Sequence, residues 1–195
     1  MIPALCSHKC LRTDGTRFFI TLTLAFSHPG EGIFRGIGMP KAGFWAIDPT
    51  RKISFGKDGW WYANDERIQN RRINVLFSQH LRKTSEGTYE IAIGWDKVKV
   101  DIDDTPYVVT RVSGDSALGF TLRLNDESEE RLDPHTLCVG QDHVLYCRVK
   151  ADEHLARFLR PAYYQLTAHV QEDVAAHSYL LRVGHALFPI PTRHQ

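Results

Sequence analysis

Hydrophobic and polar residues alternate in several short runs along the chain, which is the pattern of strands with one buried face. The runs are residues 53–55, 60–62, 89–93, 98–102, 107–112, 120–124, 136–139, 144–149 and 155–159. Turn residues separate them, beginning with Lys57-Asp58-Gly59, where glycine tolerates a positive φ. A last hairpin over residues 179–190 is predicted to turn at Gly184 and His185. Residues 125–133 are interpreted as an acidic surface loop.

Two segments have the period of a helix instead. After Ile68, apolar residues at 73, 76, 77 and 81 fall mostly on one helical face, and Glu86-Gly87 is predicted to end that helix. Pro161 suits the first turn of a second helix, which Leu166 and Val170 continue.

Each predicted helix follows strands and is led by an arginine, Arg71 in one case and Arg160 in the other. We therefore predict an α+β fold of two tandem β-rich units that share an interface, each with a packed helix. The first unit is predicted over residues 50–115 and the second over residues 116–195.

The beginning of the chain has a different pattern. Residues 18–26 are apolar apart from two threonines, and the run is far shorter than the roughly 20 residues that cross a bilayer. The segment has a weak resemblance to a signal peptide. The alternation over residues 19–24 fits a strand equally well. Residues 27–43 contain glycines and prolines typical of a loop, and Met39 is a candidate alternative start.

Composition is ordinary for a soluble domain, with 43% hydrophobic and 24% charged residues among 195. A formal net charge of +1 gives no chain-wide attraction to nucleic acid or to a membrane. Four unevenly placed cysteines favour a reducing compartment, so a cytoplasmic protein is expected. Cys138 and Cys147 flank a predicted turn and could face each other, although small buried side chains are the commoner role.

Common enzyme signatures, such as a Walker loop, a nucleophile elbow or a zinc-protease helix motif, do not occur in the sequence. The ten histidines include no pair at a helical i, i+4 spacing, which favours surface or hydrogen-bonded histidines over a metal site. No cofactor is predicted.

Two groups of residues carry candidate chemistry. Arginines in or beside predicted elements suit the bidentate capture of phosphate or carboxylate, with structural ion pairs as the alternative. Aromatic rings near them are candidates for stacking on a ligand. The candidate ligand-binding set is Trp60, Arg71, Arg148, Arg157, Arg160 and Tyr163.

The aspartates at 101, 103 and 104 form the second group. Asp101, Asp103 and Asp104 are candidate ligands of a divalent cation, because hard cations prefer clustered carboxylate oxygens. The alternative, which strand alternation favours, places Asp101 and Asp103 on the solvent side and Asp104 in the turn before Pro106.

The ordered set of motifs resembles the bacterial proteins called domain of unknown function 1285, over roughly residues 50 to 190. The motifs are Gly56-Lys-Asp-Gly-Trp-Trp-Tyr62, Ile68 with Arg71 and Leu76-Phe77, Asp104-Thr-Pro-Tyr107, Phe120-Thr-Leu-Arg-Leu-Asn125, Leu145-Tyr-Cys-Arg-Val149, Ala156-Arg-Phe-Leu-Arg-Pro-Ala-Tyr-Tyr-Gln-Leu166 and Gly184-His-Ala-Leu-Phe-Pro189. Residues 1–49 lie outside the resemblance as an N-terminal extension, and His185 stands where a second glycine is expected.

The resemblance implies a duplicated α+β architecture, a C-terminal half loosely like a pleckstrin-homology barrel and a ligand pocket between the halves. It also implies a role in bacterial signalling with a nucleotide-like ligand. Together with the arginines, it leads us to expect a non-enzymatic ligand-binding or regulatory module that takes a phosphorylated or nucleotide-like molecule. The alternatives are a hydrolase that cleaves phosphoesters with a metal ion on the three aspartates, and a protein-interaction module.

Overall fold

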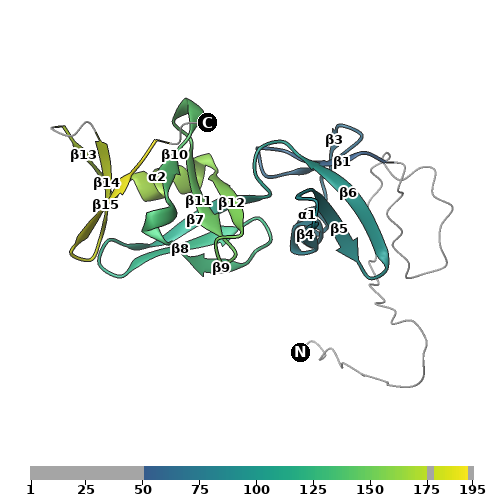
Figure 1. Cartoon of the computed structure of the whole chain (residues 1–195), viewed down its shortest axis with the longest axis horizontal. Coiled ribbons are helices and arrows are strands. Elements are labelled where there is room, and N and C mark those ends of the chain that lie inside the picture. Colours follow the sequence, from purple (N-terminus) through teal and green to yellow (C-terminus); the bar gives the residue numbers. More distant parts are fainter. Residues whose placement is uncertain (1–50, 175–177, 193–195) are drawn as a thin grey trace, which may run out of the picture. The chain divides into compact units, whose positions relative to one another are not determined.

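The structure is a computed structural model, and it describes residues 51–174 and 178–192 (Figure 1). The predictions for residues 18–43, including the strand over residues 19–24 and the start at Met39, lie outside the described residues.

The first unit is a six-stranded mixed sheet with one helix. Its strands are β1 (Ile53–Phe55), β2 (Trp61–Ala63), β3 (Glu66–Arg67), β4 (Leu81–Lys83), β5 (Tyr89–Ile93) and β6 (Asp96–Ile102). The order across the sheet is β3-β2-β1-β6-β5-β4, and only the β1–β6 pair is parallel. Helix α1 (Arg71–Gln79) connects β3 to β4. Asn70 caps it, because its side-chain oxygen accepts hydrogen bonds from the backbone N–H groups of Arg72 and Ile73.

The second unit repeats this arrangement. Its strands are β7 (Tyr107–Asp115), β8 (Gly119–Leu124), β9 (Glu129–Arg131), β10 (Cys138–Val139), β11 (Leu145–Val149) and β12 (His154–Phe158). The order is β10-β11-β12-β7-β8-β9, and the β7–β12 pair is parallel. When its six strands are numbered from its own start, the order across the sheet is identical to that of the first unit. The two tandem units predicted from the sequence therefore share one strand topology.

The helices occupy different places in the two repeats. Helix α1 follows the third strand of the first unit, whereas α2 (Arg160–Thr167) follows the sixth strand of the second. The position that corresponds to α1 holds a short 3-10 helix, η1 (Pro134–Thr136). The prediction that the helices led by Arg71 and Arg160 occupy the same position in the two repeats is therefore wrong. The α+β class, with a helix packed on each sheet, is confirmed.

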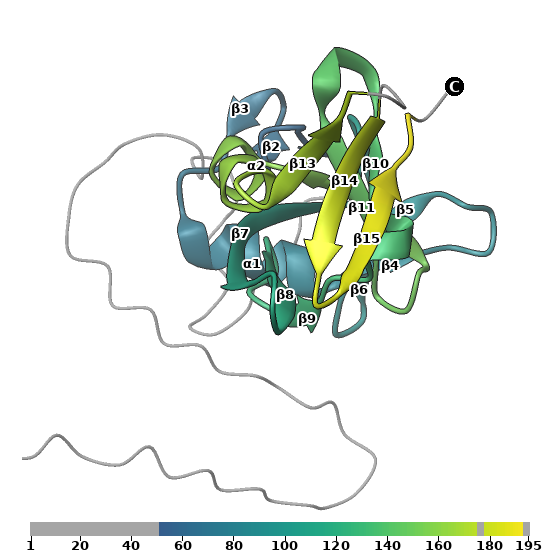
Figure 2. The ribbon, with the colours of Figure 1, turned by 90° about the vertical axis from the view of Figure 1, so that its left-hand side faces the viewer.

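A third, three-stranded sheet ends the described chain (Figure 2). Strands β13 (Val170–Asp173), β14 (Ser178–Val183) and β15 (Ala186–Ile190) pair in sequence order. Leu181 and Ile190 turn inward from this sheet and are buried in the core of the second unit. The hairpin predicted at Gly184 and His185 is confirmed.

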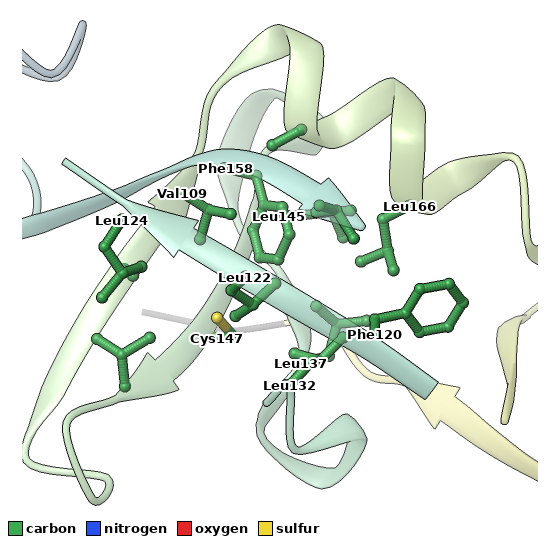
Figure 3. Packing of buried hydrophobic residues seen from close by; sticks show 14 of the residues in the cluster. Val109, Phe120, Leu122, Leu124, Leu132, Leu137, Leu145, Cys147, Phe158 and Leu166 are labelled. Carbon is green, nitrogen blue, oxygen red and sulfur yellow. The ribbon is translucent and has the colours of Figure 1, made fainter. Parts of the chain in front are cut away.

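Each unit has its own hydrophobic core. In the second unit, Val109, Leu122 and Leu124 from β7 and β8 pack with Phe158 of β12 and with Leu166 of α2 (Figure 3). In the first unit, Phe55 and Trp61 pack with ring centroids 4.9 Å apart. Burial on this scale, about 25 cal/mol for each Å² of apolar surface, holds both helices to their sheets.

Packing also joins the two units. Val108 of β7 and Leu159, which follows β12, belong to the core of the first unit. Gly59 has a φ of +81°, and a Cβ atom there would come within 2.7 Å of the Val108 side chain. Glycine is therefore required for the turn and for this close approach.

A buried polar network reinforces the junction. Ser78 Oγ of α1 accepts hydrogen bonds from Trp61 Nε1 at 3.0 Å and from Asn125 Nδ2 at 2.8 Å. Asn125 Oδ1 accepts one from the backbone N–H of Val108 at 3.0 Å. Within the described residues, no buried side-chain N or O atom lacks a partner.

Several predicted boundaries are corrected. The first helix does not continue to residues 86–87, because Leu81 pairs with Ile91 of β5 and begins β4. The second helix ends at Thr167, and Val170 pairs with Leu181 in a sheet instead. The predicted acidic loop over residues 125–133 contains β9, and the sheets change between β6 and β7 rather than at residues 115–116.

The two cysteines of the β10–β11 hairpin do not face each other. Cys138 pairs with Tyr146, so Cys147 lies one residue further along β11 and its side chain points to the opposite face. Cys147 is fully buried, and this burial raises the pKa of its thiol. It is a structural, unreactive side chain.

Candidate functional site

A polar cleft of about 490 Å³ lies between the first sheet and the β11–β12 hairpin of the second. The first unit lines it with Lys83, Thr88, Tyr89, Val100, Asp101 and Ile102. The linker between the sheets and the second unit add Asp104, Pro106, Arg148, Glu153 and Leu155. Its volume is within the range of small-molecule sites.

Strand register explains how these residues meet. Lys83, Tyr89 and Val100 are direct neighbours across β4, β5 and β6, so they form one row on one face of the first sheet. Arg148 and Leu155 are neighbours across β11 and β12. Each row begins with a basic side chain and ends in an apolar one, and the two rows line the same cleft.

The basic side chains of the cleft have no carboxylate partner. Neither Lys83 nor Arg148 forms an ion pair with any described residue, and Arg148 Nη1 donates to the backbone oxygen of Asp152 at 3.0 Å. Both side chains are exposed. An anionic group that enters the cleft would therefore meet cations that are not already neutralised.

Two of the three acidic side chains are partnered. Asp104 Oδ2 lies 2.7 Å from Arg157 Nη1 and accepts a hydrogen bond from Tyr146 at 3.0 Å. Asp101 lies 3.5 Å from Lys52 Nζ, and both of these side chains are largely exposed, so this pair contributes little stability. Glu153 makes no ion pair within the described chain.

An imidazole connects the two sheets at the side of the cleft. Tyr89 Oη lies 3.3 Å from His154 Nδ1, and the rings of Tyr107 and His154 have centroids 5.3 Å apart. Burial lowers the pKa of His154, and the charges of Lys83 and Lys150 act in the same direction. The imidazole is therefore biased towards its neutral form.

The tyrosines around this imidazole stay protonated at neutral pH. Burial raises the pKa of Tyr89, and it raises that of Tyr107 to about 12, with a further contribution from the charge of Asp126. The hydroxyl of Tyr89 lines the cleft as a neutral hydrogen-bonding group.

A second, smaller cleft of about 240 Å³ lies on the other side of Asp104. It is lined by Lys57, Asp103, Tyr146 and Arg157, and by residues 140–142 and 144 of the β10–β11 connection. Asp104 lines both clefts, so the Asp104–Arg157 ion pair stands between them.

The structure does not bring the candidate ligand-binding arginines together. Arg148 lines the first cleft and Arg157 lines the second. Arg71 Nη2 instead pairs with Glu127 at 2.7 Å, outside both clefts, and its side chain is 76% exposed. Arg160 is exposed at the start of α2 and contacts no described partner through its side chain.

The two candidate stacking rings also lie outside the clefts. The guanidinium carbon of Arg67 lies 3.7 Å from the centroid of the Trp60 ring and covers one of its faces. Tyr163 packs against the core of the second unit and has an edge contact with Tyr164. Tyr89 is the aromatic side chain that lines the first cleft.

The three aspartates of the alternative metal site have separate partners. Asp103 Oδ2 accepts a long hydrogen bond of 3.4 Å from the backbone of Lys57, while Asp101 and Asp104 pair with Lys52 and Arg157. Across the described residues, no group of three or more histidine, cysteine, aspartate or glutamate side chains is placed to hold a metal ion.

Sequence reasoning missed Lys83, Tyr89 and Glu153, which line the first cleft, and His154, which lies beside it. The helix was predicted to run through Leu81, which hid the β4–β5 hairpin. The signal was present, because Glu86-Gly87 lies between two short runs and Gly87 has a φ of +83°. A hairpin predicted at this glycine would have placed Lys83 beside Tyr89.

These features define a duplicated α+β protein with a polar cleft between its two repeats. Two solved structures share the fold, and both belong to the DUF1285 family (domain of unknown function 1285). The protein from Silicibacter pomeroyi DSS-3 is 20% identical, with 72% of this chain and 80% of that chain covered and a TM-score of 0.56. The protein from Shewanella baltica OS155 is 14% identical, with 62% and 94% covered and a TM-score of 0.50.

The fold of this chain is thus a DUF1285-like fold, which agrees with the resemblance seen in the sequence. No protein family model matches the chain, and no curated protein matches it. None of the helices in the described part of the chain is long and apolar enough to cross a membrane.

Proposed function

We propose that the protein is a cytoplasmic ligand-binding module whose site is the larger cleft, and that its ligand carries a phosphate or carboxylate group. The observation that carries this proposal is the pair Lys83 and Arg148, which come from different sheets, line one cleft and have no described ion-pair partner. Cations that are not neutralised within the protein can neutralise a ligand instead.

The position of the cleft supports a regulatory role. Residues of both repeats line it, so a ligand that contacts Lys83 and Arg148 together stabilises one arrangement of the two sheets. Ligand binding and the packing of the repeats are then thermodynamically coupled. A nucleotide remains within the proposed ligand class, with Tyr89 rather than Trp60 or Tyr163 as the ring beside the base.

Thermal unfolding with a panel of phosphorylated metabolites, nucleotides and small carboxylates tests this proposal. A ligand that binds only the native state raises the melting temperature with its concentration. We expect such a shift in the parent, and we expect Lys83→Ala and Arg148→Ala each to weaken binding roughly tenfold, about 1.4 kcal/mol.

Arg82→Ala is the matched control. Arg82 is an exposed neighbour of Lys83 on β4, and it does not line the cleft. The control should bind like the parent. The proposal fails if no compound shifts the melting temperature of the folded parent, or if the two cleft variants bind as well as the control.

A specific observation also favours the protein-interaction alternative. Most of the large exposed hydrophobic side chains of the described chain lie on α2, on or directly after a strand of the three-stranded sheet, or on the β7–β8 turn beside it. They are Leu118, Tyr164, Val174, Tyr179 and Leu187. Substitution of Leu187 by serine would lower self-association measured by sedimentation equilibrium if the face of the three-stranded sheet that carries Leu187 binds a second copy of the chain.

A further inference from the structure

We infer that the ligand of the larger cleft carries an ammonium group as well as an acidic group, and that it is a small aminocarboxylate such as an aliphatic α-amino acid. This inference rests on the proposed function, and it adds the sign and position of a second charge. It follows from three features of the cleft: its balance of charge, the clustering of that charge, and the apolar strip beside it.

The balance of charge does not suit a polyanion. Two basic and three acidic side chains line the cleft, so its lining is slightly acidic as a whole. Asp101 and Asp104 have basic partners outside the cleft lining, in Lys52 and Arg157. The charges without a described ion-pair partner are then Lys83, Arg148 and Glu153, which are of both signs. A ligand with both signs satisfies all three.

These three side chains gather at one end of the cleft, beside the β11–β12 turn. Arg148 reaches the turn directly, through its bond of 3.0 Å to the backbone oxygen of Asp152. Glu153 is part of the turn, and Lys83 is the strand neighbour of Tyr89, whose hydroxyl lies 3.3 Å from Nδ1 of the adjoining His154. A head group in which an ammonium and a carboxylate share one carbon atom needs opposite charges this close together.

Apolar side chains continue from this charged end. Leu155 is the direct neighbour of Arg148 across the hairpin, and Val100 is the direct neighbour of Tyr89. Pro106 and Ile102 line the same cleft. An aliphatic side chain that leaves the head group would lie along this strip and gain burial at about 25 cal/mol for each Å².

Isothermal titration calorimetry with four probes tests the inference on the full chain. The probes are L-leucine, N-acetyl-L-leucine, which lacks the ammonium, L-leucinamide, which lacks the carboxylate, and inorganic phosphate. We expect L-leucine to bind at least roughly tenfold more tightly than either blocked form, because each blocked form leaves a charged side chain of the site without a partner.

Glu153→Gln gives a second, independent readout. This variant should bind L-leucine and N-acetyl-L-leucine alike, because the partner of the ammonium is gone. Glu129→Gln is the matched control, since Glu129 is an exposed side chain of β9 that does not line the cleft. It should keep the preference of the parent.

The outcomes separate this inference from the proposed function. If N-acetyl-L-leucine or phosphate binds as tightly as L-leucine, the ammonium site is overturned and the anion-binding proposal stands. If L-leucinamide binds as tightly as L-leucine while N-acetyl-L-leucine does not, the anion site is overturned, and the inference with it. If none of the four binds to the folded protein, the inference fails, and the wider panel of anions decides the proposed function.

Discussion

At the scale of single residues, His154 gives the protein a pH dependence whose direction is set by its surroundings. Burial lowers its pKa below the ordinary value of about 6.5, so the unfolded chain binds the proton more readily than the native protein. The stability that the neutral imidazole contributes is fully present above that value. This stability is lost as the pH falls from about 6.5 through the lowered pKa that His154 has in the native protein.

We therefore expect the melting temperature to fall between about pH 7.5 and about pH 5.5, and His154→Gln to reduce that fall. Differential scanning calorimetry of the parent and the variant at both pH values measures the fall in melting temperature. His185→Gln provides the control, because His185 is exposed at the tip of the β14–β15 hairpin. An equal fall in both variants would assign the pH dependence to titratable groups other than His154.

At the scale of elements, the three-stranded sheet is predicted to be an integral part of the second unit. Leu181 of β14 is fully buried in that core, whereas its neighbour Leu180 points to the opposite face and is half-buried. Leu181→Ala should lower the free energy of unfolding by about 2–5 kcal/mol, and Leu180→Ala by clearly less. Urea denaturation of the two variants measures the difference. Equal effects would mean that the sheet does not contribute its inner face to the core.

Most elements of this fold could be predicted from the sequence, because alternation and turn chemistry are local signals. The strands around Phe120 and Leu122, and the hairpin at Gly184, were found in this way. The end of α1 could not be, since Leu81 continues the helical period and becomes a strand residue only through its pairing with Ile91. Tertiary pairing overrides a local period in such cases.

The candidate site was less predictable for the same reason. Arg148 was found because arginines in or beside predicted elements suit the capture of an anionic group. Lys83 was not found, because its place in the cleft depends on the register of β4 with β5. Arg71 and Arg160 looked equivalent in sequence, yet they begin helices at different positions of the two repeats. Convergence of side chains is a property of register and topology, which single residues do not reveal.

At the scale of the whole molecule, the two repeats are predicted to unfold as one cooperative unit. Val108 and Leu159 of the second repeat pack in the core of the first, and Asn125, which is held by the backbone of Val108, bonds across the junction to Ser78. Separate unfolding of either repeat would expose these groups without compensation. Each hydrogen bond lost in this way costs about 0.5–1.5 kcal/mol net.

Two probes report on the two repeats separately. The tryptophans of the described chain, including the buried Trp61, lie in the first unit, and Cys147 is fully buried in the second. Tryptophan fluorescence and the reaction of Cys147 with a thiol reagent should therefore give the same urea midpoint in the parent protein. In Asn125→Ala, the junction loses the side-chain hydrogen bonds of Asn125, so both midpoints should fall, and any separation between them should first appear in this variant. Two distinct midpoints in the parent would instead show that each repeat is stable alone, and the cleft between them would then lie between independently folding domains.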